Sequence, residues 1–202
     1  MVVDFGCRVG IDVILASHKV GLHGRVIGID FAPQMIERAK QFLVEAGLQD
    51  RNIELRTADL EKTQIADCSV DIVISNCVIN LCPDKDAVYK EAYRILRPGG
   101  RLAISDIILT EKIDLELRGR FQSTWAGCMG GCIPEEDYLQ IITKAGFTEI
   151  QIVAHHVLTS GVLLAMACCP SEEFTPSPDK EDLALVEGKV VSIKFTAIKP
   201  RL

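Results

Sequence analysis

The chain has 202 residues, a length that suits one domain with a sizeable core and is short for two. Its net charge is −6 and apolar residues make up 48% of the sequence, which excludes a long disordered chain and argues against nucleic acid as a partner. The first residues lack a signal core, and no apolar segment approaches the roughly 20 residues that span a bilayer, so we expect a cytoplasmic protein without a membrane partner.

Apolar runs that end in a polar residue or glycine alternate with helix-period segments along the first half of the chain. The runs are "MVVDFG", "RVIGID", "NIELRTAD", "VDIVISN" and "RLAISDIIL". This alternation predicts a doubly wound α/β fold with a mostly parallel sheet that is covered on both faces.

Two local features within this half are expected to support the fold without carrying chemistry. A helix is predicted from Pro33 to Ala46, ended by Gly47. Its core-facing stripe should consist of Met35, Ala39, Phe42, Leu43 and Ala46. The string "LRPGGRL" predicts a tight reversal at Gly99-Gly100, directly before another strand.

The second half of the chain continues the α/β pattern and ends on a different kind of strand. The predicted elements are a helix around Leu115 to Thr124, a loop "AGCMGGC", a helix from Pro134 to Ala145 and a strand at Glu149 to Ala154. Pro170 to Asp182 is polar and proline-rich and should be a loop. The final run "KVVSIKFTAIK" alternates and should be antiparallel, and the absence of an internal repeat favours one domain over 1–202.

The first strand-to-helix turn, "VVDFGCRVGIDV", combines two glycines with a carboxylate at the end of the next strand. Gly6 and Gly10 can let backbone approach a ligand, and Asp30 is placed to accept hydrogen bonds from ribose hydroxyls. The alternative is that Asp30 only caps the local backbone at the end of this strand and binds no ligand. A dinucleotide fits poorly because Arg8 occupies the position of the middle glycine in G-x-G-x-x-G.

Polar side chains also follow the third and fourth predicted strands. Asp59 is positioned to meet an adenine amino group, and Asn76 can line the same crevice. Polar groups at three consecutive strand ends predict a nucleoside pocket rather than a phosphate pocket.

The motifs around these residues resemble those of a known family. The strings "VIGID", "SVDIVISNCVINL" and "RILRPGGRLAISDI" look like class I S-adenosylmethionine methyltransferases, and "SNCVINL" with "WAGCMGGCIPEEDYL" resembles the arsenite methyltransferases. The match runs from Val2 to about Val153 and resumes at "GKVVSIKFTAIKP".

The resemblance implies a Rossmann-like methyltransferase that binds S-adenosylmethionine and methylates arsenite or its thiol conjugate, a small-molecule substrate. It assigns the cofactor to Asp4, Gly6, Gly10, Asp30, Asp59, Leu60 and Asn76. It assigns the arsenic atom to Cys77 and Cys128, a choice that agrees with the preference of soft, thiophilic arsenic for thiolates. The resemblance is compatible with either a monomer or a homo-oligomer.

The remaining cysteines have competing explanations. Cys82 and Cys132 stand where the family usually has other small residues, and they are candidates for additional arsenic ligands. Together with Cys77 and Cys128 they approach the spacing of a four-cysteine zinc site, which is the alternative. Cys68 is expected to be a small core residue, and the pair Cys168-Cys169 is expected to belong to the core as well.

The sequence departs from the family pattern at its start. The family has residues before the first strand, including a helix that covers the cofactor, so we expect the cofactor to be more exposed here. Cys7 and Arg8 replace small residues in the cofactor loop. Arg8 is expected to intrude toward the ligand and, at positive φ, to add strain on the order of 1 kcal/mol. Methylation of another small molecule, or binding of arsenicals or zinc without turnover, are the alternative functions.

Overall fold

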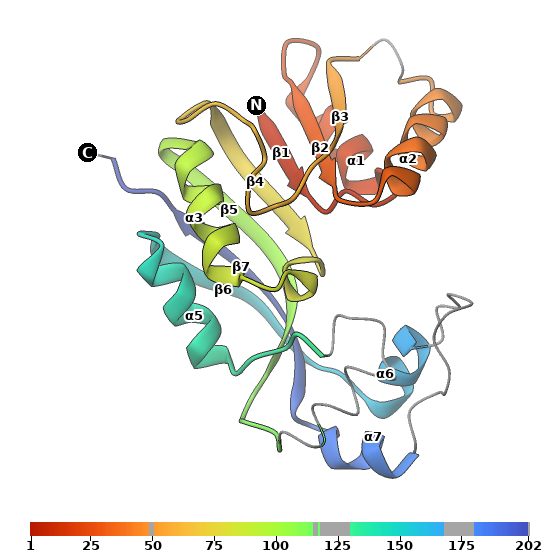
Figure 1. Cartoon of the computed structure of the whole chain (residues 1–202), viewed down its shortest axis with the longest axis vertical. Helices are drawn as coiled ribbons and strands as arrows, with labels where there is room; N and C mark the ends of the chain where they lie inside the picture. The colour runs from red at the N-terminus through yellow and green to blue at the C-terminus, as the bar shows by residue number, and fades with distance from the viewer. Residues whose placement is uncertain (49–50, 115–116, 118–129, 168–179, 202) are drawn as a thin grey trace.

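A seven-stranded sheet organises the chain (Figure 1). The computed structural model describes residues 1–48, 51–114, 117, 130–167 and 180–201. The strands are β1 (Val2–Phe5), β2 (Val26–Asp30), β3 (Ile53–Thr57), β4 (Val70–Asn76), β5 (Leu96–Leu109), β6 (Thr148–Val157) and β7 (Val190–Ile198). Their order is β3-β2-β1-β4-β5-β7-β6, and β7 runs antiparallel to both neighbours while the other pairs are parallel. The predicted doubly wound, mostly parallel sheet with one antiparallel strand is confirmed.

Helices cover the two faces of this sheet in pairs. The helices are α1 (Ile11–Val20), α2 (Pro33–Glu45), α3 (Lys85–Ile95), α5 (Glu135–Lys144), α6 (Ser160–Ala167), α7 (Lys180–Val186) and the short 3₁₀ turn η1 (Ile79–Leu81). α1 contacts β1 and β2, and α2 contacts β2 and β3, whereas α3 and α5 contact β5 and each other. Figure 1 shows α1 and α2 on the opposite side of the sheet from α3 and α5, with α6 and α7 beyond the ends of β6 and β7.

The first two strands are mostly apolar because both of their faces are buried. Every residue of β1 and β2 is buried. Alternate side chains enter different cores: Val3 and Ile27 join the main apolar cluster, while Val2 and Val26 pack with Val13 of α1 in a smaller one. This two-sided burial is what the continuous apolar runs predict. In contrast, β6 lies at the sheet edge and most of its residues are exposed.

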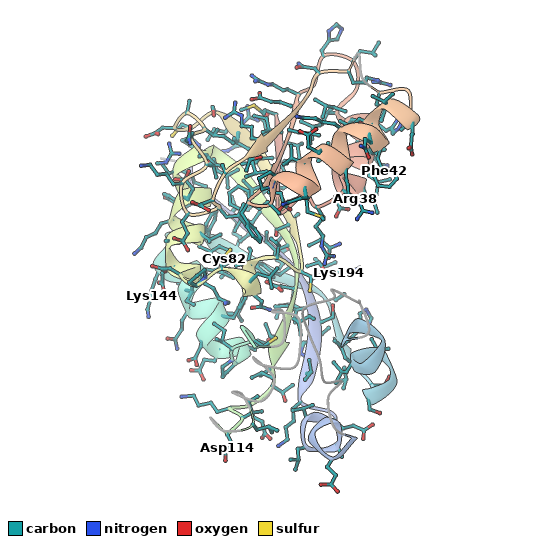
Figure 2. All side chains as sticks on the ribbon, turned by 45° about the vertical axis from the view of Figure 1, so that its right-hand side comes forward. Arg38, Phe42, Cys82, Asp114, Lys144 and Lys194 are labelled. Carbon is teal, nitrogen blue, oxygen red and sulfur yellow. The ribbon has the colours of Figure 1, made fainter. Side chains whose placement is uncertain are left out.

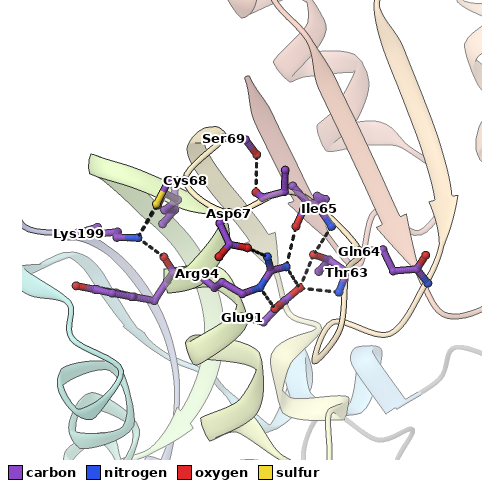
Figure 3. A network of polar contacts seen from close by, with 12 residues as sticks. Thr63, Gln64, Ile65, Asp67, Cys68, Ser69, Glu91, Arg94 and Lys199 are labelled. Carbon is purple, nitrogen blue, oxygen red and sulfur yellow. Dashed lines mark hydrogen bonds and ion pairs between the residues drawn. The ribbon is translucent and has the colours of Figure 1, made fainter.

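A polar network holds α3 against the segment that follows β3 (Figure 3). The guanidinium of Arg94 bonds both carboxylate oxygens of Glu91, the carboxylate of Asp67 and the carbonyl of Ile65. The backbone N–H and hydroxyl of Thr63 donate to the same Glu91 carboxylate at 2.7 and 2.6 Å. Burial opposes ionisation of Glu91, but the bonds from Arg94 and Thr63 outweigh it and lower the pKa of this carboxyl.

Some local expectations are wrong in detail. The buried face of α2 consists of Ile36, Ala39 and Leu43, and Phe42 is 43% exposed on the outer side. The stripe is therefore rotated from the predicted one. The strand after α3 begins at Leu96 rather than after Gly100, and the two glycines lie in an irregular stretch of β5.

The second half of the chain follows the expected order where the structure describes it. The predicted helix at Pro134–Ala145 is α5, preceded by Pro134 as its cap, and the predicted strand at 149–154 is part of β6. The helix expected at 115–124 and most of the polar loop at 170–182 lie outside the described residues, and the last residues of that loop, 180–182, belong to α7. Within the described ranges, no helix has the length and apolar character needed to cross a membrane.

Candidate active site

The loop between β1 and α1 is shaped by two glycines with positive φ. Gly6 has φ 76°, and a Cβ atom built there would overlap the side chain of Val78. Gly10 has φ 87° and caps α1, close to Ala39. Gly6 is thus the position where a side chain would close the space between this loop and the turn after β4.

Asp30 ties the same loop to the end of β2. Its Oδ2 accepts a hydrogen bond from the backbone N–H of Arg8 at 2.9 Å, and its Oδ1 accepts one from the N–H of Ala32 at 3.0 Å. The side chain is buried but lines a cavity. Because each carboxylate oxygen can accept more than one hydrogen bond, the capping role leaves acceptor capacity for a ligand.

A first cavity of about 390 Å³ opens at the carboxyl ends of the parallel strands. It brings together four of the predicted cofactor residues, Gly6, Asp30, Asp59 and Leu60. Cys82, predicted as a possible thiol ligand, lines this cavity as well, and the residues that sequence reasoning missed are Phe31, Glu61, Val78, Leu81 and Pro83. Phe31 could have been found, since it directly follows the carboxylate at a strand end; it is 64% exposed. The position is where open α/β sheets bind ligands.

A second cavity of about 450 Å³ lies on the sheet face that α1 and α2 share. Its lining follows rows of residues that are paired across the sheet, Asp4–Ile74–Ala103–Thr196 and Asn76–Ser105–Lys194. Asp4 and Asn76, predicted to lie with Gly6 and Asp30, line this second cavity instead of the first, whereas Gly10 lines neither. Figure 2 shows Cys82 of the first cavity and Lys194 of the second on different sides of the central strands.

Asp4 is the most unusual charge in this region. The residue is only 2% exposed, and its Oδ2 has no hydrogen-bond partner among the residues that the structure describes. Burial, followed by repulsion from Asp12 and Asp30, raises the pKa of Asp4 to about 8. Burial therefore favours the protonated form of this carboxyl, and Asp4 is among the residues that line the second cavity.

Cys77 lies along the chain between residues of the two cavities, although it is not itself among the residues that line either one. It follows Asn76, which lines the second cavity, and precedes Val78, which lines the first. Its backbone has φ 56°, and its N–H donates to the carbonyl of Ser105 at 2.8 Å. The half-buried side chain packs against an apolar cluster that contains Ile107 and Cys132. Cys128, predicted as its partner, lies outside the described residues.

The other described cysteines are dispersed. Cys82 packs against the main core, and burial raises the pKa of its thiol to about 11. Cys7 is buried in the small cluster near α1, where burial and then Asp4 raise the pKa of its thiol. The expectation that Cys68 is a core residue is wrong: it is exposed, with its Sγ 3.7 Å from the ammonium of Lys199 (Figure 3). Cys168 and Cys169 lie outside the described residues.

The zinc alternative finds no support in this arrangement. Cys77 and Cys132 share an apolar cluster, but Cys82 belongs to the main core and to the first cavity. Among the residues that the structure describes, no three His, Cys, Asp or Glu side chains are grouped so that they could hold a metal ion. A four-cysteine site would require Cys82 to join the other two.

The backbone of Arg8 has the expected positive φ, but its side chain does not lie where we expected it. Its φ of 48° agrees with the predicted positive value. Its side chain, however, is exposed and is not among the residues lining either cavity. Arg8 thus contributes backbone to the loop, through the bond to Asp30, and does not intrude on the ligand space.

A buried hydrogen-bond network lies behind the turn that carries Cys77. The hydroxyl of Tyr89 donates to that of Tyr138, which donates to Oδ2 of Asp106, both at 2.8 Å. The other oxygen of Asp106 accepts from the side chain of Asn80 and from the N–H of Ile107, both at 2.9 Å. Burial raises the pKa of Asp106 to about 6, against the opposing effect of these bonds. The network fixes η1 to β5 and α5.

Comparison with known proteins places this arrangement in a family. Residues 1–146 match the family model described as "Methyltransferase domain". The arsenite methyltransferase of Halobacterium salinarum is 38% identical over 151 residues, which are 75% of this chain and 38% of that protein. The human arsenite methyltransferase is 34% identical over 165 residues, 78% of this chain and 44% of that protein. The chain thus spans less than half the length of these relatives.

The solved structures agree with the sequence comparison. The arsenic (III) S-adenosylmethionine methyltransferase of Chlamydomonas reinhardtii superposes with a TM-score of 0.79 at 27% identity. That match covers all of this chain and 63% of the algal protein. The YcgJ protein of Bacillus subtilis superposes with a TM-score of 0.77 at 16% identity, which shows the same fold.

Proposed function

Because the chain belongs to the methyltransferase-domain family, we propose that it is an S-adenosylmethionine-dependent methyltransferase that acts on trivalent arsenic. The observation that carries the proposal is the place of Cys77, a thiol between the residues that line the two cavities. A soft thiol is the natural protein ligand for arsenic. The arsenite methyltransferases that the chain resembles support this choice of acceptor.

The residues of the first cavity suit the nucleoside part of S-adenosylmethionine. Asp30 has acceptor capacity for ribose hydroxyls, Asp59 can accept from an amino group, and Gly6 keeps the loop open where a Cβ would meet Val78. Phe31 offers an aromatic face at the rim. When bound, the cofactor supplies a methyl group on a positively charged sulfur.

Asp4 suits the charged end of the same cofactor. Asp4 lines the second cavity beside Asn76, and its Oδ2 has no hydrogen-bond partner among the described residues. A cationic group placed there would favour the ionised carboxylate and lower its raised pKa. Asp4 would then bind and orient the cofactor from the sheet face, while Asp30 holds it from the end of β2.

Cys77 would hold the acceptor. The thiol of Cys77 displaces one hydroxide of arsenous acid as water, so that an As–S bond forms while an As–O bond and an S–H bond break. The arsenic keeps its lone pair and is already nucleophilic, so that the site must align it rather than deprotonate it. No histidine is among the described residues that line either cavity, which suits a reaction without a general base.

The test is product analysis after incubation of the chain with arsenite, a small thiol and methyl-labelled S-adenosylmethionine. Label in methylarsenicals is the expected result. Label in another small molecule added as acceptor, and none with arsenite, would show a different methyltransferase. Binding of cofactor and arsenite with no transfer would show a binding protein and would contradict the proposed activity.

A further inference from the structure

We propose that Cys132 is an additional thiol ligand for the arsenic acceptor held at Cys77. The inference rests on the proposed function and concerns the ligands of the same site. The sequence makes both Cys132 and Cys82 candidates for an additional thiol ligand of arsenic. The packing of the described residues separates them and selects Cys132.

The two thiols share one apolar cluster although they are far apart in sequence. Cys132 is fully buried in the cluster with Ile107 and Leu109, and the half-buried Cys77 packs against the same cluster. Ile107 and Leu109 belong to β5, whose Ser105 carbonyl receives the N–H of Cys77. The end of β5 therefore brings the two cysteines to one place.

The segment that carries Cys132 is fastened directly to the turn after Cys77. A Cβ at Gly131 would overlap the backbone carbonyl of Asn80, so only glycine allows this close approach. On the other side of Cys132, the carbonyl of Ile133 accepts the N–H of Leu109 at 3.0 Å. These flanking contacts fix the position of the backbone at Cys132.

Asn80 supplies a polar environment for the buried sulfur. Its side-chain nitrogen lies 3.6 Å from Sγ of Cys132, while it also bonds Oδ1 of Asp106 at 2.9 Å and the carbonyl of Ile107 at 2.5 Å. An N–H directed at sulfur favours the electron-rich, metal-bound form of a thiolate. The Oδ1 atom of Asn80 is buried and has no hydrogen-bond partner within the described part of the chain. A plain apolar core position would not need this amide.

Cys82 lacks these relationships. It packs against the main core and lines the first cavity, next to Leu81 and Pro83. Its Sγ lies 3.9 Å from the carbonyl of Val78, an acceptor that suits a protonated thiol, and burial raises its pKa. Cys82 therefore belongs to the first cavity, which we assign to the cofactor, whereas Cys132 belongs to the apolar cluster against which Cys77 packs.

Binding through Cys132 needs no oxidant or reductant. The Cys132 thiol displaces a further hydroxide of the arsenic as water, forming one As–S bond and breaking one As–O bond and one S–H bond. Once Cys77 holds the arsenic, the second thiol binds within the same molecule. Its effective concentration is then high, so affinity rises by tenfold or far more.

The experiment measures arsenite binding to the full chain without cofactor. Arsenic X-ray absorption counts the As–S bonds, and a titration gives the dissociation constant. We expect Cys132→Ser to lose one As–S bond and to weaken binding about tenfold or more. Cys68→Ser, which removes an exposed thiol outside both cavities, is the matched control and should change neither quantity.

The outcomes separate the inference from the function on which it rests. An unchanged As–S count in Cys132→Ser, or a loss in Cys82→Ser instead, overturns the inference while the methyltransferase proposal stands. An unchanged count in Cys77→Ser contradicts the proposed acceptor site itself. If Cys132→Ser is unfolded, judged by thermal unfolding, Cys132→Ala is measured in its place, since alanine leaves no unpaired hydroxyl in the apolar cluster.

Discussion

Asp4 illustrates how a single residue can be unfavourable for folding and useful for binding. The buried carboxyl lies near Asp12 and Asp30, and its Oδ2 has no hydrogen-bond partner within the described ranges. Such unpaired buried groups are normally avoided because they lose hydration without compensation. Because Asp4 is among the residues that line a cavity, a cationic ligand bound there could compensate the carboxylate.

The raised pKa of Asp4 predicts a specific pH dependence of stability. Between the ordinary aspartate pKa of 3.8 and the raised pKa of about 8, the folded state keeps a proton that the unfolded chain has released. The free energy of unfolding therefore falls as pH rises through this window, by up to about 1.4 kcal/mol per pH unit. Asp4→Asn cannot ionise and should lack this contribution. Urea unfolding of both proteins from pH 5 to 8 checks this, and parallel pH profiles would contradict it.

Phe31 should contribute to cofactor binding and little to stability. It is 64% exposed at the rim of the first cavity, so Phe31→Ala should change the free energy of unfolding by less than about 0.5 kcal/mol. Loss of the aromatic face should weaken S-adenosylmethionine binding about tenfold. Calorimetric titration measures this. Phe42→Ala on α2, the control, removes another exposed aromatic ring and should leave the affinity unchanged (Figure 2). Equal affinities for all three proteins would exclude Phe31 from the site.

At the scale of elements, two polar networks fix the structures that carry the site. Tyr89, Tyr138, Asp106 and Asn80 join α3, α5, β5 and η1 in the interior. Arg94 and Glu91 join α3 to the segment that leads away from Asp59. Both networks converge on α3, whose preceding turn carries Cys77 and Cys82.

Removal of one hydroxyl should weaken the interior network measurably. Tyr138→Phe leaves Oδ2 of Asp106 without its donor and the hydroxyl of Tyr89 without its acceptor. We expect a loss of about 1 to 3 kcal/mol in the free energy of unfolding. Tyr93→Phe is the control, because the Tyr93 hydroxyl makes no hydrogen bond within the described ranges and its ring keeps its edge contact with Phe147. An equal loss of unfolding free energy in the two variants would show that the hydrogen bonds of the interior network do not add to stability.

Loss of the Arg94 guanidinium should destabilise the chain in a pH-dependent manner. Arg94→Met leaves the carboxylate of Glu91 without its cation, and we expect a loss of about 1 to 3 kcal/mol at pH 7. The pKa of Glu91 is lowered in the folded chain, so its ionic contribution is present above pH 4.5 and disappears as pH falls through the folded value. The difference between the two proteins should shrink at acidic pH. Measurement of the free energy of unfolding of both proteins at pH 7 and pH 4 tests this. A difference between the two proteins that is the same at both pH values would contradict the electrostatic explanation.

At the scale of the whole molecule, the sequence predicts the sheet and one part of the site. Continuous apolar runs reflect strands buried on both faces, and polar residues at their ends lie at one edge, as Gly6, Asp30 and Asp59 do. The assignment of Asp4 and Asn76 to the other cavity could not be predicted. It depends on which face of a strand a side chain takes, and on how the helices cover that face.

The separation of Cys82 from Cys132 likewise depends on tertiary packing. Their spacings relative to Cys77 and Cys128 look equivalent in sequence. The η1 turn directs Cys82 to the first cavity, while the contact of Gly131 with Asn80 brings Cys132 to the cluster beside Cys77. Such a contact between distant segments has no local sequence signal.

The most direct test of the central claim is the rate of methyl transfer from labelled S-adenosylmethionine to arsenite by the full chain and by two variants. The wild-type chain and Cys68→Ser should form methylarsenicals at the same rate. Cys77→Ser should be about a hundredfold slower or more, because the acceptor is no longer aligned, while its affinity for the cofactor is unchanged. A Cys77→Ser variant that methylates arsenite at the wild-type rate, or a wild-type chain that binds both ligands and forms no methylarsenical, would contradict the account.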